Sequence, residues 1–107
     1  HMGNLVSLGK FKEEKILHII FNNYVHESTG GQSVANDKIN YKSILKACGY
    51  KVVKDISNLN QFKKEINKPI KKLTALIIKI NSGTIENLPR PKETLKYLKI
   101  KLQKKLI

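Results

Sequence analysis

The chain has 107 residues, of which 21 are basic and 8 acidic, so its formal net charge is +13. A chain of this length builds one domain at most, and its single cysteine excludes an internal disulfide and a cysteine-rich zinc site. No apolar run approaches the roughly 18 residues of a membrane-spanning helix. We therefore expect a cytoplasmic protein with no membrane partner.

The positive charge is almost entirely lysine, because Arg90 is the one arginine in the sequence. Proteins that read nucleic-acid sequence depend on arginine, whose planar guanidinium pairs bidentately with phosphate and guanine. The lysines are spread along the chain in short pairs such as Lys63-Lys64, which is typical of a solvated surface. We expect no nucleic-acid partner, and a small basic nucleic-acid-binding module stays an alternative.

The first elements in chain order are a helix end, a strand and a long polar loop. The apolar stretch from Asn4 to Gly9 indicates the end of a helix. The nearly continuous apolar run from Ile16 to Phe21 is typical of a strand buried on both faces. The segment from Asn22 to Asn40 predicts a polar loop.

The middle of the chain predicts two capped helices around a short strand. Apolar residues recur at helical spacing from Tyr41 to Cys48, with Asn40 as the N-cap. A short strand is expected from Lys51 to Lys54. Asn58 caps the next helix, which Pro69 ends.

The last two elements are a strand and an amphipathic helix. The strand runs from Leu73 to Ile80, and a loop from Asn81 to Pro91 follows it. Leucines at positions 95, 98, 102 and 106 then predict the helix. This alternation predicts an α/β fold, a parallel sheet with flanking helices and right-handed crossovers. Three strands make a thin sheet, so we expect residues 1–107 to be the carboxyl-terminal part of a larger domain.

The loop after the first strand is the candidate ligand site, because open α/β sheets bind ligands beyond the carboxyl ends of their strands. Asn22 and Asn23 can offer a carbonyl oxygen to magnesium. Gly30 and Gly31 allow positive φ and a close approach of backbone to ligand. The alternative is a polar turn in which the two asparagines bond their own backbone.

Three strings of residues in this sequence resemble one enzyme family. A strand that ends in Asn-Asn is the second half of the thiamine-diphosphate signature, which opens with Gly-Asp-Gly. The longer string from Asn22 to Ser33 resembles the phosphonopyruvate decarboxylase family, as do Ala47-Cys48-Gly49-Tyr50 and Ser82-Gly83-Thr84 with the segment 87–91. The resemblance runs from Gly3 to Thr94. Tyr24, Val34 and Pro89 depart from the family pattern, and Tyr24 stands where the family often has glycine.

The resemblance implies a partial thiamine-diphosphate-binding fold, the C-terminal part of the diphosphate-binding domain, with thiamine diphosphate and Mg²⁺ as cofactors. It implies that the Asn23 side-chain oxygen and the Val25 backbone carbonyl hold magnesium. The residues that it places at the cofactor are Asn22, Asn23, Val25, Ser28, Gly30, Gly31 and Gln32. Neither His26 nor Glu27 is given a proton-transfer role, and the catalytic residues stay unknown.

The implied reaction is the decarboxylation of 3-phosphonopyruvate to phosphonoacetaldehyde and carbon dioxide in phosphonate biosynthesis. A sulfopyruvate decarboxylase or another small thiamine-diphosphate enzyme is the alternative. The sequence holds neither the Gly-Asp-Gly nor the pyrimidine-binding domain. We therefore expect a fragment or split segment that is inactive alone, completed by a missing N-terminal portion or partner subunit and forming a homo-oligomer. A non-catalytic remnant used for subunit association is a further possibility.

Three other side chains have packing as their expected role. Cys48 falls on the apolar face of its helix, where it is expected to act as a small buried hydrophobe. Tyr41 and Tyr50 are expected to pack in the core. For Arg90 two roles stay open, binding a phosphonate or anchoring the carboxyl-terminal loop.

Overall fold

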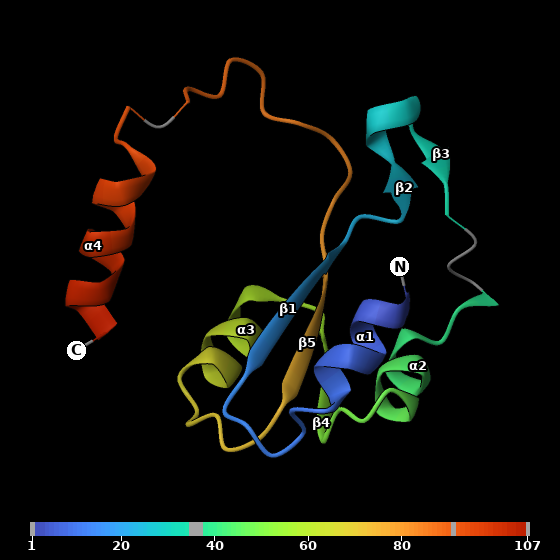
Figure 1. Ribbon diagram of the computed structural model, residues 1–107. Coiled ribbons are helices and arrows are strands. Elements are labelled where there is room, and N and C mark those ends of the chain that lie inside the picture. The colour runs from blue at the N-terminus through green and yellow to red at the C-terminus, as the bar shows by residue number, and fades with distance from the viewer. Residues whose placement is uncertain (1, 35–37, 91, 107) are drawn as a thin grey trace.

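A computed structural model describes residues 2–34, 38–90 and 92–106, the side chain of residue 106 excepted (Figure 1). Pro91, the last residue of one predicted loop, therefore lies outside the described residues. The elements in chain order are α1 (Met2–Gly9), β1 (Leu17–Asn22), β2 (Val25–His26), the 3-10 turn η1 (Glu27–Thr29), β3 (Gln32–Ser33), α2 (Tyr41–Ala47), β4 (Val52–Ile56), α3 (Leu59–Ile66), β5 (Thr74–Lys79) and α4 (Leu95–Leu106).

The main sheet is parallel, which confirms the predicted α/β class. Its strand order is β1-β5-β4, so β5, the last strand in the chain, lies between the other two. Leu17 of β1 and Val52 of β4 both pair with Thr74 of β5, so the three strands start level. The chain passes through α2 between β1 and β4 and through α3 between β4 and β5.

Both predicted N-caps are confirmed. The Asn40 side chain accepts a 2.9 Å hydrogen bond from the backbone N–H of Ser43 at the start of α2. Asn58 does the same for Gln61 at the start of α3, also at 2.9 Å. Each cap satisfies a backbone donor that the first turn of a helix leaves without a partner.

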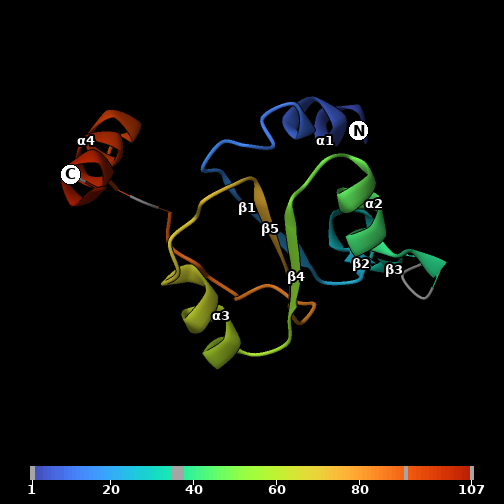
Figure 2. The ribbon, with the colours of Figure 1, turned by 90° about the horizontal axis from the view of Figure 1, so that it is seen from below.

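The two faces of the sheet are covered by different helices. Figure 2 shows α1 and α2 on one side of the sheet and α3 on the other. The main core lies on the first side and consists of Leu45, Tyr50, Val53, Leu73, Ala75 and Ile77. Leu5 and Leu8 of α1 pack against this core. The sheet therefore has a well-packed face under α1 and α2.

The expectation that β1 is buried on both faces is wrong. Its residues are half-buried except Phe21, whose side chain is 65% exposed. The reason is the strand order, because β1 lies at an edge and β5 takes the central place, where residues 74–77 are buried. The strand predicted from Lys51 to Lys54 is β4, which runs two residues further, to Ile56.

The predicted last helix is present as α4, but it lies away from the sheet in both views (Figures 1 and 2). Its apolar side chains are exposed, Leu95 by 86% and Leu102 by 59%. Cys48 packs against the core as a small hydrophobe, as expected, but it is half-buried where burial was expected. The packing roles of Tyr50, which is buried, and Tyr41, which is half-buried against the core, are confirmed.

Candidate functional site

The candidate site begins where β1 ends, at the carboxyl edge of the parallel sheet. Asn22 is the last residue of β1 and pairs with Lys79, the last residue of β5. After Asn23 the chain forms a small antiparallel hairpin, in which Val25 pairs with Ser33. Within the segment from Asn22 to Asn40 that was expected to be a polar loop, residues 25–33 form this hairpin, which stands beyond the strand ends (Figure 1), and residues 35–37 lie outside the described residues.

Both asparagines form the turn that leads into the hairpin. The Asn22 side-chain oxygen accepts a 3.1 Å hydrogen bond from the backbone N–H of Tyr24. The Asn23 oxygen accepts one from Val25 at 3.3 Å. These contacts are those of the polar-turn alternative. An amide oxygen carries two lone pairs, so this turn is compatible with a second donor or a cation on the same atom.

Tyr24 has a left-handed backbone, with φ of 64°. This is the position at which the resembling family often has glycine, the residue that takes positive φ without steric cost. The tyrosine ring lies beneath the Lys79 ammonium, whose nitrogen is 5.3 Å from the ring centre. A cation held over a ring is stabilised by the ring's negative face, and this contact links the hairpin to the end of β5.

The predicted positive φ at the two glycines is confirmed, with 111° at Gly30 and 77° at Gly31. Gln32 closes the same turn, since its side-chain N–H donates to the Thr29 carbonyl at 2.7 Å. The Thr29 hydroxyl donates in return to the Gln32 side-chain oxygen at 3.0 Å. Gln32 therefore has a structural role in the hairpin, which the sequence did not indicate.

Glu27 connects the hairpin to the segment after β5. Its carboxylate accepts a hydrogen bond from the backbone N–H of Gly83. Glu27 and Gly83 are 56 residues apart in the sequence. Their contact brings together in space two of the strings that resemble the decarboxylase family. No local pattern in the sequence signals such a contact, because it depends on how β1 and β5 pair.

Beneath the turn lies a cleft of about 460 Å³. Its lining is drawn from the end of β1, from α2 and the segment before it, and from the ends of β4 and β5. The lining residues are Asn22, Tyr24, Lys38, Ile39, Asn40, Tyr41, Lys42, Asp55 and Ile77. Of the predicted cofactor-binding residues, Asn22 lines this cleft, whereas Val25, Ser28 and the other hairpin residues do not.

The sequence did not predict the charged residues that line the cleft. The Lys42 ammonium lies 3.6 Å from the Asp55 carboxylate across the cleft. Asp55 was missed because the strand was expected to end at Lys54. Its position near the carboxyl end of a strand is the signal that identifies it once the strand bounds are known.

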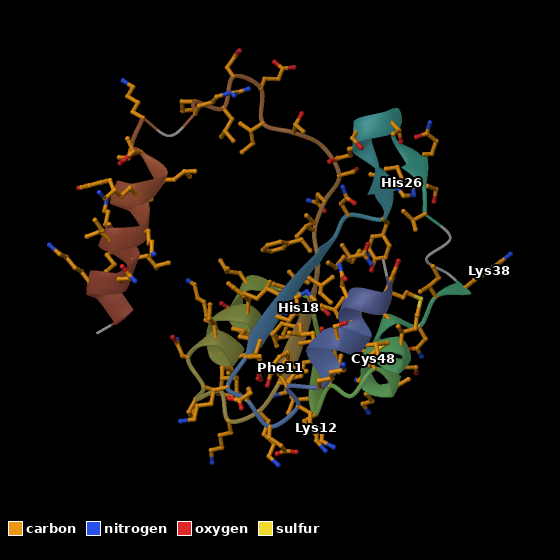
Figure 3. All side chains as sticks on the ribbon, in the orientation of Figure 1. Phe11, Lys12, His18, His26, Lys38 and Cys48 are labelled. Atoms are coloured by element: carbon orange, nitrogen blue, oxygen red, sulfur yellow. The ribbon has the colours of Figure 1, made fainter. Side chains whose placement is uncertain are left out.

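His18 and His26, the two histidines among the described residues, lie apart (Figure 3). Figure 3 shows His26 on the hairpin and His18 in the body of the sheet. His18 is joined through its Nδ1 to the Tyr50 hydroxyl by a 2.8 Å hydrogen bond. Burial raises the pKa of Tyr50 above its usual 10.0, so this hydroxyl keeps its proton at neutral pH.

Among residues 2–34, 38–90 and 92–106, no three histidine, cysteine or acidic side chains lie close enough together to hold a metal ion. A metal at the turn would therefore depend on neutral oxygens from asparagine and backbone, together with oxygens of a bound anion. Magnesium accepts such a set, because it takes oxygen ligands and commonly binds phosphates. The oxygen donors at this turn are therefore of the kind that magnesium diphosphate requires.

Two further observations concern the rest of the chain. Arg90 is exposed in the segment that leads to α4. No helix in the described part of the chain has the length and apolar character needed to cross a membrane.

Comparison with known proteins gives two similar sequences, and no family model matches the chain. A phosphonopyruvate decarboxylase of Streptomyces viridochromogenes is 27% identical over 95 residues, which cover 87% of this chain and 24% of that protein. A phosphonopyruvate decarboxylase of Streptomyces hygroscopicus is 27% identical over 93 residues, which cover 85% of this chain and 23% of that protein. The chain thus spans about a quarter of the length of these curated relatives. The similarity supports a distant relationship to the decarboxylase family that the Asn22–Ser33 string resembles.

Proposed function

We propose that this chain forms the magnesium- and diphosphate-binding edge of a thiamine-diphosphate-dependent decarboxylase that acts on 3-phosphonopyruvate. The observation that carries the proposal is the Asn22-Asn23 turn at the carboxyl edge of a parallel sheet. That turn stands within a stretch of similarity to decarboxylases that covers 87% of the chain. Ligands of open parallel sheets bind at this edge.

In this proposal the turn holds the metal. The Asn23 side-chain oxygen and the Val25 carbonyl are neutral oxygen donors on successive parts of the turn. The 3.3 Å contact from the Val25 N–H to Asn23 is at the long end for a hydrogen bond, so turning the oxygen toward a cation loses little. Nothing lies within 4 Å of a Cβ built at Gly31, so the surroundings of this left-handed glycine are open to a ligand.

Bound thiamine diphosphate would supply the electron sink for the loss of carbon dioxide from a 2-oxoacid. The chain's own part is to bind and orient the anionic groups. Its net charge of +13 favours the approach of a diphosphate and a phosphonate. Glu27 would keep the hairpin and the segment at Gly83 in one arrangement around the ligand.

The binding step is tested by calorimetric titration of the chain with thiamine diphosphate, with and without Mg²⁺. We expect magnesium-dependent binding that Asn23→Ala weakens by about tenfold or more, the cost of one lost ligand. Asn60→Ala is the matched control, because Asn60 is exposed on the surface of α3. The metal assignment would be contradicted if the two variants bound thiamine diphosphate equally well, or if binding did not depend on Mg²⁺.

The reaction is tested with the chain completed by the portion of a decarboxylase that carries Gly-Asp-Gly and the pyrimidine-binding domain. We expect magnesium- and cofactor-dependent release of carbon dioxide from 3-phosphonopyruvate, and loss of that activity in Asn23→Ala. Sulfopyruvate is assayed beside it. Faster turnover of sulfopyruvate would keep the cofactor assignment and overturn the substrate.

A further inference from the structure

The second face of the sheet carries an apolar groove beside β1 and α3. The groove has a volume of about 280 Å³ and is lined by Phe21, Asn58, Leu59, Phe62, Ile78 and Lys79. Phe21 is 65% exposed and Leu59 63% exposed. Parallel sheets are normally covered on both faces, so this face is missing a covering element next to α3.

Helix α4 has the complementary surface. Leu95, Leu98 and Leu102 follow one another at helical spacing and form one stripe. The charged residues of the helix are all lysines, and Lys105, seven residues after Leu98, lies at the end of the stripe. The helix has 12 residues and is therefore about 18 Å long. Strands β1 and β5 have six residues each, about 20 Å, so the helix matches the length of the sheet.

The helix and the groove of one chain are kept apart. The segment after β5 carries α4 away from the sheet in both views (Figures 1 and 2), and both apolar surfaces are left exposed. A second copy of the chain can cover both, because each α4 then fills the groove of the other copy. Such a reciprocal exchange is an isologous twofold contact, and it doubles the buried area toward the roughly 1,000 Å² of a specific interface.

We propose that α4 of one copy docks in the groove formed by Phe21, Leu59, Phe62 and Ile78 of a second copy, and reciprocally, so that the chain is an exchanged dimer. This goes beyond the proposed function and does not depend on it. Lys96, Lys101 and Lys104, on the other sides of α4, stay in solvent in this arrangement. Lys79, at the rim of the groove, has its ammonium over the Tyr24 ring of the hairpin, so its charge is directed away from the incoming helix.

The pattern of α4 favours a protein groove over an anionic lipid surface. Helices that lie on membranes have one apolar face and one continuous polar face. In α4, Ile100 and Tyr97 are 42% and 53% exposed and lie on the side away from the leucines, among the lysines. A narrow leucine stripe on an otherwise mixed surface is suited to a narrow apolar groove.

The first test is the dimer dissociation constant by sedimentation equilibrium. We expect a dimer that persists at about 1 M salt, because its contacts are apolar. Leu102→Lys should weaken it by about 100-fold, since the change enters both exchanged contacts. Ile100→Lys is the matched control, with the same added charge on the opposite side of α4. A monomer at all concentrations, equal effects of the two variants, or dissociation by salt would overturn the proposal.

The second test separates exchange from docking within one chain. In a Cys48→Ala background, a tagged Leu59→Cys copy is mixed with an untagged Leu98→Cys copy, and a disulfide between the two is expected on oxidation. When Ile100→Cys replaces Leu98→Cys, we expect little disulfide between the two copies. A double variant that forms its disulfide within one chain when dilute would show that α4 covers its own groove, and would overturn the exchange. Capture of anionic vesicles or RNA by α4 in place of the disulfide would do the same.

Discussion

The two faces of the sheet differ in how far they are closed. Under α1 and α2, Leu73 and Ala75 are fully buried, at 0% exposure. On the opposite face Leu76 is buried at 1%, yet Phe21 at the β1 edge is 65% exposed. Ile56 of β4 is buried on this face as well, at 4% exposure, so the face is open beside β1 rather than at the end of β4. The difference teaches that packing on the first face supplies most of the core that stabilises the fold. The second face is available for association beside β1.

The largest effect is expected from shortening a side chain on the closed face. Leu73→Ala leaves a cavity at a fully buried position and should cost about 2–5 kcal/mol of the free energy of unfolding. Leu59→Ala, on the open face, should change it by less than about 0.5 kcal/mol at protein concentrations where the chain is monomeric. Urea unfolding measures both, and equal losses would remove the distinction between the faces.

A methyl group at the contact between α1 and α2 should have the next largest effect. Gly9 is buried, and an added Cβ would lie 1.7 Å from the Cys48 carbonyl oxygen. Gly9→Ala must push α1 away from the end of α2, which should cost about 1–3 kcal/mol of the free energy of unfolding. Gly3→Ala is the control in the same helix, since nothing lies within 4 Å of its added Cβ. An unchanged unfolding midpoint for Gly9→Ala would mean that α1 does not close this face.

The polar contact inside the first face should be worth less. Tyr50→Phe keeps the buried ring but removes the hydroxyl that is hydrogen-bonded to His18 at 2.8 Å. The expected loss is about 1 kcal/mol, because the imidazole nitrogen loses its partner in a half-buried position. Tyr97→Phe, on exposed α4, should leave the urea midpoint where it is. A loss as large as that of Leu73→Ala would show a polar network rather than a single bond.

The smallest effect is expected on the open face, where an ion pair between Lys54 and Glu65 joins β4 to α3. Glu65 lies 2.5 Å from the Lys54 ammonium and 2.6 Å from that of Lys68. Hydrogen bonds from Lys54 and Lys68 hold the pKa of Glu65 below its usual 4.5. A carboxylate with a lowered pKa stabilises the fold above about pH 4.5, and that contribution is lost as the pH falls through the lowered pKa.

Glu65→Gln should therefore lower the thermal midpoint slightly at pH 7 and flatten its decline below pH 4.5. Glu14→Gln, an exposed change of the same kind, is the control. Thermal scans from pH 7 to pH 3 make the comparison. A decline identical to that of the unchanged chain would show that the two lysines do not stabilise the Glu65 carboxylate.

At the candidate site, the sequence determined the chemistry of the turn but not its surroundings. Paired asparagines and glycines restrict their own backbone, so the turn and the positive φ values at Gly30 and Gly31 follow from local preferences. The Glu27 contact with Gly83 and the Lys42–Asp55 pair join residues from different elements. Such contacts depend on strand order, which no local pattern contains.

The sequence by itself determined the α/β class, the helices with their asparagine caps, and the place of the polar turn after β1. These depend on spacing, capping and apolar runs, which act between residues close in the chain. Only the tertiary structure decided that β5 takes the centre and that β1 lies at an edge. It also decided that α4 lies apart from the sheet, because an apolar stripe shows that a helix needs a partner without showing which surface supplies it.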